Sequence, residues 1–147
     1  MTHLYPIQRV TLITLGVQDL ARARAFYRAL GWHPHSERDR ISFFQMQGAA
    51  LALYPLADLG DDMDRPPATL GTGAATLSQN FATEEAVDEV WHKALQAGAT
   101  PIKVPQAVAW GGYSGYFADP DGHVWELAMN PFWPLADDGS LTLPEGG

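Results

Sequence analysis

Hydrophobic and polar residues follow two different periods between residues 10 and 54. Residues 10–17 form an apolar, β-branched run that predicts a strand. Asp19 stands where a helix begins, since its carboxylate can accept hydrogen bonds from the free amides of the first turn. Apolar residues then recur with the spacing of one helical face, at Ala23, Phe26, Tyr27 and Leu30. Gly31 ends this helix. Three short strands are expected after it, at residues 32–36, 41–46 and 51–54.

The same order of elements recurs in the second half of the chain. Residues 75–81 predict a strand, and Thr83 precedes a helix whose acidic first turn favours the positive end of the helix dipole. The apolar face of this helix comprises Val87, Val90, Trp91, Ala94 and Leu95. Gly98 closes it, and three strands follow at residues 100–104, 113–118 and 124–129. The last two are joined by the turn Asp119-Pro120-Asp121-Gly122.

The two halves align with one another, so the chain carries an internal repeat. The pairs that share one offset are residues 26–30 with 91–95, Asp19 with Glu84, and Leu12 with Leu77. The last strands pair Leu53 with Glu126 when a longer loop is allowed for in the second half. Two units in the order strand, helix, three strands predict an α+β fold built from a repeated βαβββ module.

We expect one domain over residues 1–147, composed of two modules. The first βαβββ module spans residues 7–55 and the second spans residues 75–130. Between them lies an acidic connecting loop at residues 56–74, which is either a solvated loop or a lid. A tail at residues 131–147 is rich in aromatic residues and proline near its start, and we expect it to pack over a hydrophobic surface.

Composition supports a packed core and limits the chemistry. Of the 147 residues, 46 % are hydrophobic and 18 % are charged, as in an ordinary globular chain. The absence of cysteine excludes disulfides, thiolate metal sites and a cysteine nucleophile. A formal net charge of -8 disfavours nucleic acid as a partner. No apolar run approaches the roughly 20 residues of a membrane span, and the chain begins without a visible secretory signal. We therefore expect a cytoplasmic protein without a membrane partner.

Three motifs carry a family resemblance. They are Gly16-Val17-Gln18-Asp19-Leu20, the run from Phe26 to Trp32, and the run from Asp119 to Leu127. Together they resemble the vicinal-oxygen-chelate superfamily, which includes glyoxalase I, bleomycin-resistance proteins, fosfomycin-resistance proteins and extradiol dioxygenases. The resemblance implies that each βαβββ module forms half of an open, curved sheet with the active cleft inside it. Residues 110–117 and 130–135 are similar to a glyoxalase-like branch whose members mostly lack an assigned substrate.

Metal-using members of this superfamily hold a divalent cation through side chains on the first and last strands of each half. Carried over residue by residue, the resemblance places these ligands at Leu12, Leu53 (within one residue), Leu77 and Glu126. Leucine cannot coordinate a hard cation. The resemblance therefore implies a degenerate metal site and no cofactor. The alternative is a divalent metal held by Glu126, Gln79 and water.

Glu126 is the candidate residue for catalysis. Alternation along its strand puts it on one face with Val124 and Ala128, away from Trp125 and Leu127. A carboxylate in such apolar surroundings must be hydrogen-bonded, paired or protonated. Glu126 is therefore a ligand anchor or a general base, or else an acid whose hydrogen bonds are satisfied by neighbouring Tyr, Trp, Gln or Ser side chains.

Four further side chains are candidates for ligand binding, namely Gln79, Trp110, Tyr113 and Tyr116. Gln79 lies two residues after Leu77 on the same face, where it can orient a substrate or bond to Glu126. The aromatic residues flank glycines that let a loop approach a ligand, and ordinary core filling is an equal alternative. His33 and His35 share one face, but a pair supplies only half of a tetrahedral metal site.

These observations support two main functions. The first is a small-molecule-binding protein that binds an apolar or aromatic ligand or transfers a proton through Glu126. The second is a divalent-metal-dependent lyase or isomerase related to glyoxalase I, and a non-catalytic interaction module is a third possibility. The number of ligand-type side chains favours the first. Exposed strand edges and aromatic residues such as Phe132 and Trp133, together with the twofold dimers common in the superfamily, lead us to expect a homodimer.

Overall fold

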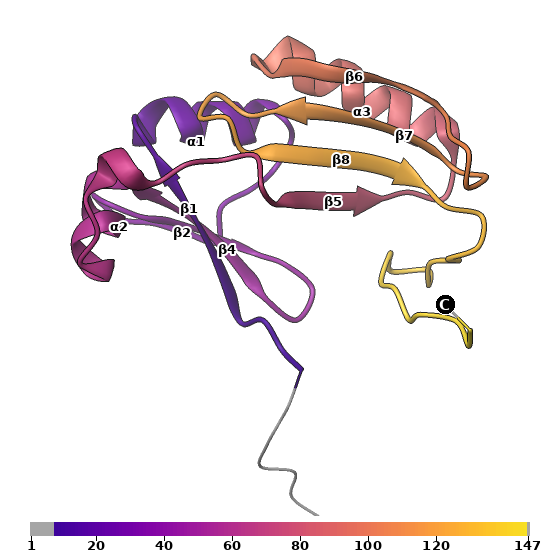
Figure 1. Ribbon diagram of the computed structural model, residues 1–147, viewed down its shortest axis with the longest axis horizontal. Helices are drawn as coiled ribbons and strands as arrows, with labels where there is room; N and C mark the ends of the chain where they lie inside the picture. The colour runs from indigo at the N-terminus through magenta and orange to yellow at the C-terminus, as the bar shows by residue number, and fades with distance from the viewer. Residues whose placement is uncertain (1–7, 147) are drawn as a thin grey trace, which may run out of the picture.

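The computed structural model describes residues 8–146, so the predicted limits at residues 7 and 147 lie outside its described part. Strands of the first module are β1 (Leu12–Val17), β2 (Ser36–Glu37), β3 (Ser42–Gln45) and β4 (Ala50–Pro55). Strands of the second are β5 (Thr76–Asn80), β6 (Thr100–Ala107), β7 (Tyr113–Ala118) and β8 (Val124–Met129). They form two four-stranded sheets, β1-β4-β3-β2 and β5-β8-β7-β6 (Figure 1). This repeated α+β arrangement is the one that the sequence predicts.

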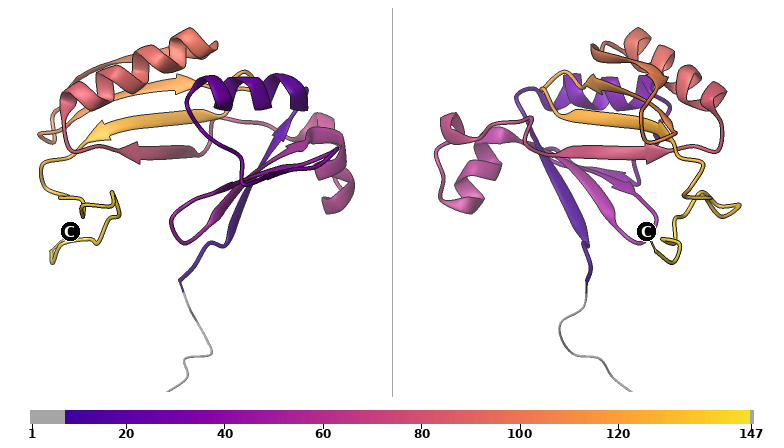
Figure 2. Two further views of the ribbon diagram at one scale, coloured as in Figure 1. Left: turned by 180° about the vertical axis from the view of Figure 1, so that it is seen from behind. Right: turned by 45° about the vertical axis from the view of Figure 1, so that its right-hand side comes forward.

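Two long helices cover the sheets from one side. Helices α1 (Leu20–Ala29) and α3 (Glu84–Ala97) are adjacent in the views of Figures 1 and 2. Each begins at the predicted cap, because the side chains of Asp19 and Thr83 each accept a hydrogen bond of 3.1 Å from the amide three residues on. Gly98 ends α3 with a left-handed φ of 109°. None of the helices within residues 8–146 is both long and apolar enough to cross a bilayer.

Each sheet has a helix face and an open face, because successive side chains of a strand point to opposite sides. The helix faces carry the buried residues Leu15, Val17, Phe44, Leu51, Leu53, Phe117, Trp125 and Leu127. With Phe26 and Tyr27 of α1 and Trp91 of α3 they form one continuous core. The two modules therefore share a core, while their open faces stay outside it.

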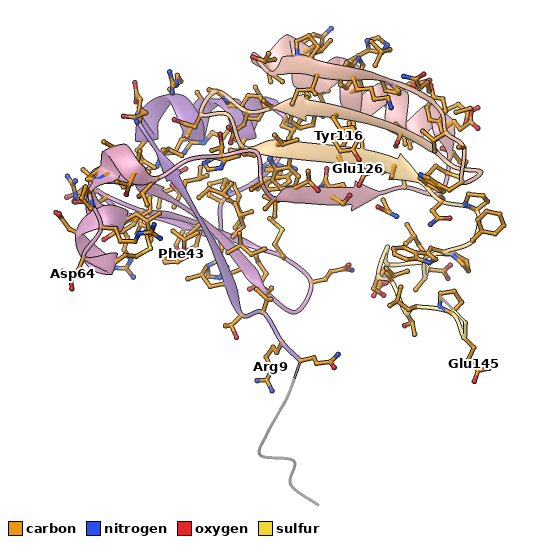
Figure 3. All side chains as sticks on the ribbon, in the orientation of Figure 1. Arg9, Phe43, Asp64, Tyr116, Glu126 and Glu145 are labelled. Atoms are coloured by element: carbon orange, nitrogen blue, oxygen red, sulfur yellow. The ribbon has the colours of Figure 1, made fainter. Side chains whose placement is uncertain are left out.

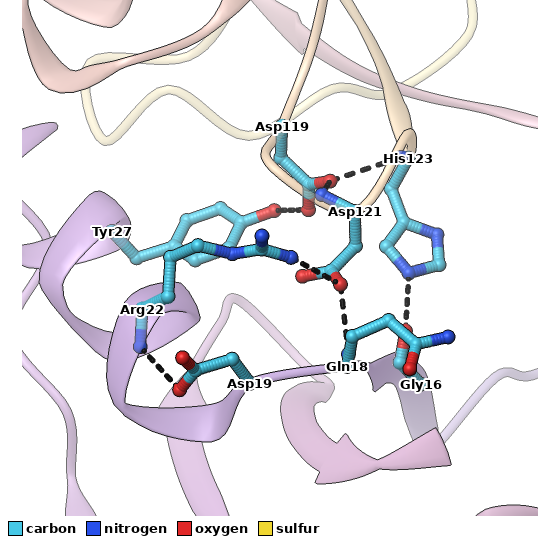
Figure 4. A network of polar contacts seen from close by, with 8 residues as sticks. All are labelled: Gly16, Gln18, Asp19, Arg22, Tyr27, Asp119, Asp121 and His123. Atoms are coloured by element: carbon cyan, nitrogen blue, oxygen red, sulfur yellow. Dashed lines mark hydrogen bonds and ion pairs between the residues drawn. The ribbon is translucent and has the colours of Figure 1, made fainter.

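A hydrogen-bonded network joins the two modules (Figure 4). The hydroxyl of buried Tyr27 donates to Asp119 Oδ2 at 2.6 Å and accepts from the indole N–H of Trp125 at 3.0 Å. Burial raises the pKa of the Tyr27 phenol well above its ordinary value, and the Asp119 charge raises it further, so the hydroxyl stays protonated. Asp119 Oδ1 accepts from the amides of Asp121 and His123, which shapes the predicted turn.

The same turn also contacts β1. Asp121 Oδ1 accepts from the Gln18 amide at 2.8 Å and from the Arg22 guanidinium at 3.0 Å. His123 Nε2 lies 2.8 Å from the Gly16 carbonyl oxygen. The β7–β8 turn of the second module is thus fixed against the first strand and first helix of the first module.

The connection between the modules differs most from expectation. The predicted loop over residues 56–74 contains a helix, α2 (Leu56–Met63), and a short 3-10 turn, η1 (Pro67–Thr69). Leu56, Leu59 and Met63 are spaced along one helical side, and α2 packs on β1 and β4. The aspartates of this segment suggested a solvated loop, but they occupy the other side of an amphipathic helix.

Smaller differences occur at strand ends. The predicted strand over residues 32–36 is wrong except at its end, because only Ser36–Glu37 forms β2. Pro34 has no N–H for a strand ladder, and the Trp32 ring turns inward, 5.3 Å from the rings of both Tyr27 and Trp125.

The tail after β8 folds back on itself. Leu135 forms an isolated bridge with Leu141, and the Gln47 side chain donates to the Asp138 carbonyl oxygen at 2.8 Å. The tail of the second module thereby contacts the β3–β4 turn of the first.

We predict that Tyr27→Phe lowers the free energy of unfolding by about 1–3 kcal/mol, since it leaves buried Asp119 and the Trp125 N–H each short of a partner. Urea denaturation monitored by circular dichroism measures the change. Tyr113→Phe is the matched control, because its hydroxyl bonds a carboxylate in a less buried place, and its cost should be below about 1 kcal/mol. Equal losses in the two variants would contradict the assigned role of Tyr27.

Candidate functional site

Glu126 lies at the centre of the second sheet on its open face. The strand register places it between Ser78 of β5 and Tyr116 of β7. The Ser78 hydroxyl donates to Glu126 Oε1 at 2.6 Å, and the Tyr116 hydroxyl donates to Oε2 at 3.1 Å. Figure 3 shows Tyr116 and Glu126 side by side on neighbouring strands. We call these three residues the Ser78–Glu126–Tyr116 row.

The alternation that the sequence predicts for β8 explains this position. Trp125 and Leu127 are buried on the helix face, whereas Glu126 points the other way and is only half-buried. Each carboxylate oxygen receives one hydroxyl hydrogen bond and keeps a further lone pair. The site can therefore accept another hydrogen bond, or a proton, from a bound molecule.

The Tyr116 phenol is kept protonated, so that it can donate a hydrogen bond. Desolvation raises the pKa of its phenol, and the hydrogen bond to Glu126 and the charge of Glu126 raise it further. The hydroxyl consequently donates to Glu126 at neutral pH.

Gln79 does not join this row. It pairs with Leu127 on the helix face and lines a small cavity of about 260 Å³ beside Trp32 and Phe44. The prediction that Gln79 lies beside Glu126 is wrong, and Ser78 takes that place. A shift of one residue in register moves every side chain of a strand to the opposite face. The alignment of the two halves that the sequence suggested was wrong by one residue, so it placed Gln79 on the wrong face of β5.

The same shift corrects two of the metal-ligand positions that the resemblance implied. Leu53, which is fully buried, and Leu77 both face the helices. Because the helix caps Asp19 and Thr83 and the strand starts Leu12 and Thr76 are each 64 positions apart, Thr76 matches Leu12. The parallel pairs Thr14–Ala52 and Ser78–Glu126 match Ala52 with Glu126.

The corrected set is Leu12, Ala52, Thr76 and Glu126. One carboxylate and one hydroxyl do not fit the ligand requirement of a divalent cation. His33 and His35 are both exposed, and among residues 8–146 no three metal-ligand side chains come together.

The three aromatic residues that were predicted to bind a ligand together lie in three different places. Tyr116 is on the open face, whereas the Tyr113 hydroxyl donates to Asp88 of α3 at 2.6 Å, a bond that raises the Tyr113 pKa to about 12. Trp110 lies in the β6–β7 turn, with its ring against Gly112, where a Cβ would stand 1.9 Å from a ring carbon. Of these three aromatic residues, only Tyr116 forms a hydrogen bond with Glu126.

Sequence reasoning missed two features. Ser78 was overlooked because the offset between the halves was taken one residue too long. A cavity of about 720 Å³ beneath α2 was also missed, although the spacing of Leu56, Leu59 and Met63 was a readable helical signal.

Known proteins similar to this chain share its repeated fold. The sequence model of the Glyoxalase/Bleomycin resistance protein/Dioxygenase superfamily matches residues 9–127, which include most of both modules. The crystal structure of a glyoxalase-related enzyme from Fulvimarina pelagi is 36 % identical, with a TM-score of 0.86 over 93 % of this chain and 99 % of that one. A hypothetical protein from S. aureus is 25 % identical, with a TM-score of 0.74 over 86 % of this chain and 96 % of its own.

More distant structures share the fold alone. Lactoylglutathione lyase from Agrobacterium tumefaciens is 22 % identical, with a TM-score of 0.67 over 89 % of this chain and all of that one (100 %). No curated protein matches the chain significantly.

We predict that Glu126→Gln lowers the pKa of Tyr116, because the substitution removes a negative charge that opposes phenolate formation. Tyrosine labelled with ¹³C at Cζ allows each phenol to be titrated separately by NMR. The Tyr113 titration, which depends on Asp88, serves as the internal control and should not move. An unchanged Tyr116 titration would show that the two side chains are not in contact.

Proposed function

The chain belongs to the glyoxalase/bleomycin resistance protein/dioxygenase superfamily, and we propose that it is a small-molecule-binding member with a degenerate metal site. In this proposal Glu126 anchors an apolar or aromatic ligand, or accepts a proton from it. The observation that carries the proposal is the Ser78–Glu126–Tyr116 row, in which a half-buried carboxylate is oriented by two hydroxyls and retains free lone pairs.

The surroundings of Glu126 support an apolar ligand. Cross-strand pairs on either side of it place Ala118 and Val124 at one end and Ser114 and Ala128 at the other. These small side chains leave a shallow, mostly apolar floor on which a ring can lie. A hydroxyl, amide or acidic C–H on such a ring would then face the carboxylate.

The chemistry of Glu126 allows two roles that differ in their need for a charge. An anchor needs only an acceptor oxygen, which the carbonyl of glutamine also offers. A general base needs a group that takes up a proton, which glutamine does not. Substitution by glutamine and by alanine therefore separates binding from proton transfer.

A divalent-metal lyase or isomerase is the competing function. Of the four positions that would hold the metal, Leu12 and Ala52 offer no donor, Thr76 offers only a neutral hydroxyl, and Glu126 alone is a strong ligand. Elemental analysis of protein purified without chelator tests this function. One equivalent of bound Zn, Mn, Ni or Fe that is lost in Glu126→Gln would replace the proposal made here.

We predict that Glu126→Ala weakens binding of neutral aromatic fragments that carry a hydrogen-bond donor by about tenfold or more, since a hydrogen bond to a charged group is worth roughly 1.5–3 kcal/mol. Thermal shift identifies the fragments and NMR titration measures their affinities. Glu126→Gln should retain most of the binding if Glu126 is an anchor, and should abolish exchange of the ligand proton if it is a base. Glu145→Gln, on the exposed tail, is the matched control. Undiminished binding and exchange in Glu126→Ala would leave Glu126 with a structural role only.

We also predict a homodimer. Trp110 in the β6–β7 turn and Phe132 on the tail are large apolar side chains that the single chain leaves exposed. Sedimentation equilibrium at micromolar concentration should give twice the chain mass of 16.0 kDa. A mass of one chain would contradict the prediction.

A further inference from the structure

A cavity of about 720 Å³ lies under α2, apart from the Ser78–Glu126–Tyr116 row. Its walls come from the open face of β1, from α2, from the segment after η1 and from the β7–β8 turn. No member of the row lines it. The volume is within the range of sites that bind small organic molecules.

One side of this cavity is apolar. Its apolar lining residues are Leu12, Leu56, Leu59, Met63 and Leu70. Gly16 allows α2 to come this close, since a Cβ on Gly16 would lie 2.6 Å from Leu56 Cδ1. The wall can therefore bury an apolar body of the size of two fused rings.

The backbone after α2 is shaped to present Arg65 at this cavity. Asp64 has a φ of 56°, and it is the one non-glycine residue with positive φ among residues 8–146. The turn is closed by the Arg65 amide, which donates to the Gly60 carbonyl at 2.9 Å. A Cβ on Gly60 would lie 2.6 Å from the Arg65 carbonyl oxygen. The left-handed backbone of Asp64 and the close approach at Gly60 thus fix the backbone position of Arg65.

The guanidinium of Arg65 forms no hydrogen bond or ion pair with the described residues. By contrast, Arg22, Arg28 and Arg40 are paired with Asp121, Glu37 and Asp58. An unpaired arginine at a cavity wall is notable in a chain whose net charge is -8. Arginine suits carboxylates because its planar group donates two parallel hydrogen bonds.

Two other ionisable residues line the cavity. Asp121 is 3 % exposed; its Oδ1 is paired with Arg22 at 3.0 Å, and its buried Oδ2 has no hydrogen-bond partner among the described residues. His123 also lines the cavity, and its Nε2 lies 2.8 Å from the Gly16 carbonyl oxygen. Because the Asp121 charge is balanced by Arg22, Arg65 is the unpaired charge at the cavity wall.

We propose that this cavity is a second ligand site, which binds an amphipathic carboxylate. The apolar body of the ligand lies on Leu56, Leu59 and Met63, and its carboxylate pairs with Arg65. The proposal does not depend on the function of Glu126.

The test compares 2-naphthoate with N,N-dimethyl-2-naphthamide, a neutral probe that has no hydrogen-bond donor for Glu126, by isothermal titration calorimetry. Wild-type protein should bind naphthoate more tightly than the neutral probe. Arg65→Gln should weaken naphthoate binding at least tenfold and leave binding of the neutral probe unchanged, because only the charged probe loses an ion pair. Met63→Gln should weaken both probes alike, because it removes apolar contact without changing charge. Amide shifts in ¹H–¹⁵N spectra should cluster on residues 56–72.

Two control variants locate the effect. Arg9→Gln removes an arginine far from α2 (Figure 3) and should leave both affinities unchanged. Glu126→Gln should also leave naphthoate binding unchanged, so that failure of this site and failure of the Glu126 site are distinguishable. The proposal is overturned by no naphthoate binding at millimolar concentration, by equal effects of Arg65→Gln and Arg9→Gln, or by shifts that cluster on β5, β7 and β8.

Discussion

The buried hydrogen bond between Tyr27 and Asp119 determines how the two modules are placed. Asp119 is almost fully buried, and its two oxygens accept from a phenol of the first module and from two amides of its own turn. Burying a carboxylate costs free energy unless its hydrogen bonds are made. This turn therefore acts with the shared core to fix the relative position of the modules, and the cavity under α2 includes the turn in its wall.

Much of this fold can be predicted from the sequence because local signals agree with one another. Asp19 and Thr83 cap the helices, glycine ends α3, and the Asp-Pro-Asp-Gly turn joins β7 and β8 as expected. The strand predicted at residues 32–36 forms only at its end, because Pro34 lacks an N–H for pairing and the Trp32 ring turns into the core. Helix α2 was missed because charge was given more weight than the spacing of three apolar residues.

The candidate site was predicted less well than the fold, and the cause is geometric. Glu126 was identified with its correct face, because alternation within one strand is visible in the sequence. Its partners lie on other strands, and their identity depends on register. An alignment of the halves that is wrong by one residue selects Gln79 and Leu77 in place of Ser78 and Thr76, and thereby exchanges the faces of β5. Once corrected, the repeat shows that its halves have diverged. The first open face offers Leu12 and Ala52 where the second offers Thr76 and Glu126.

The contact between Tyr27 and Asp119 joins residues 92 positions apart in the chain. During synthesis the first module leaves the ribosome well before its partner residues exist, with Tyr27 and Trp32 lacking the cover of Trp125. Contacts of such large sequence separation are slow to form, and the exposed apolar surface promotes association between nascent chains. The interval between synthesis of the first module and completion of the second is therefore the stage at which we expect the chain to be most prone to aggregation.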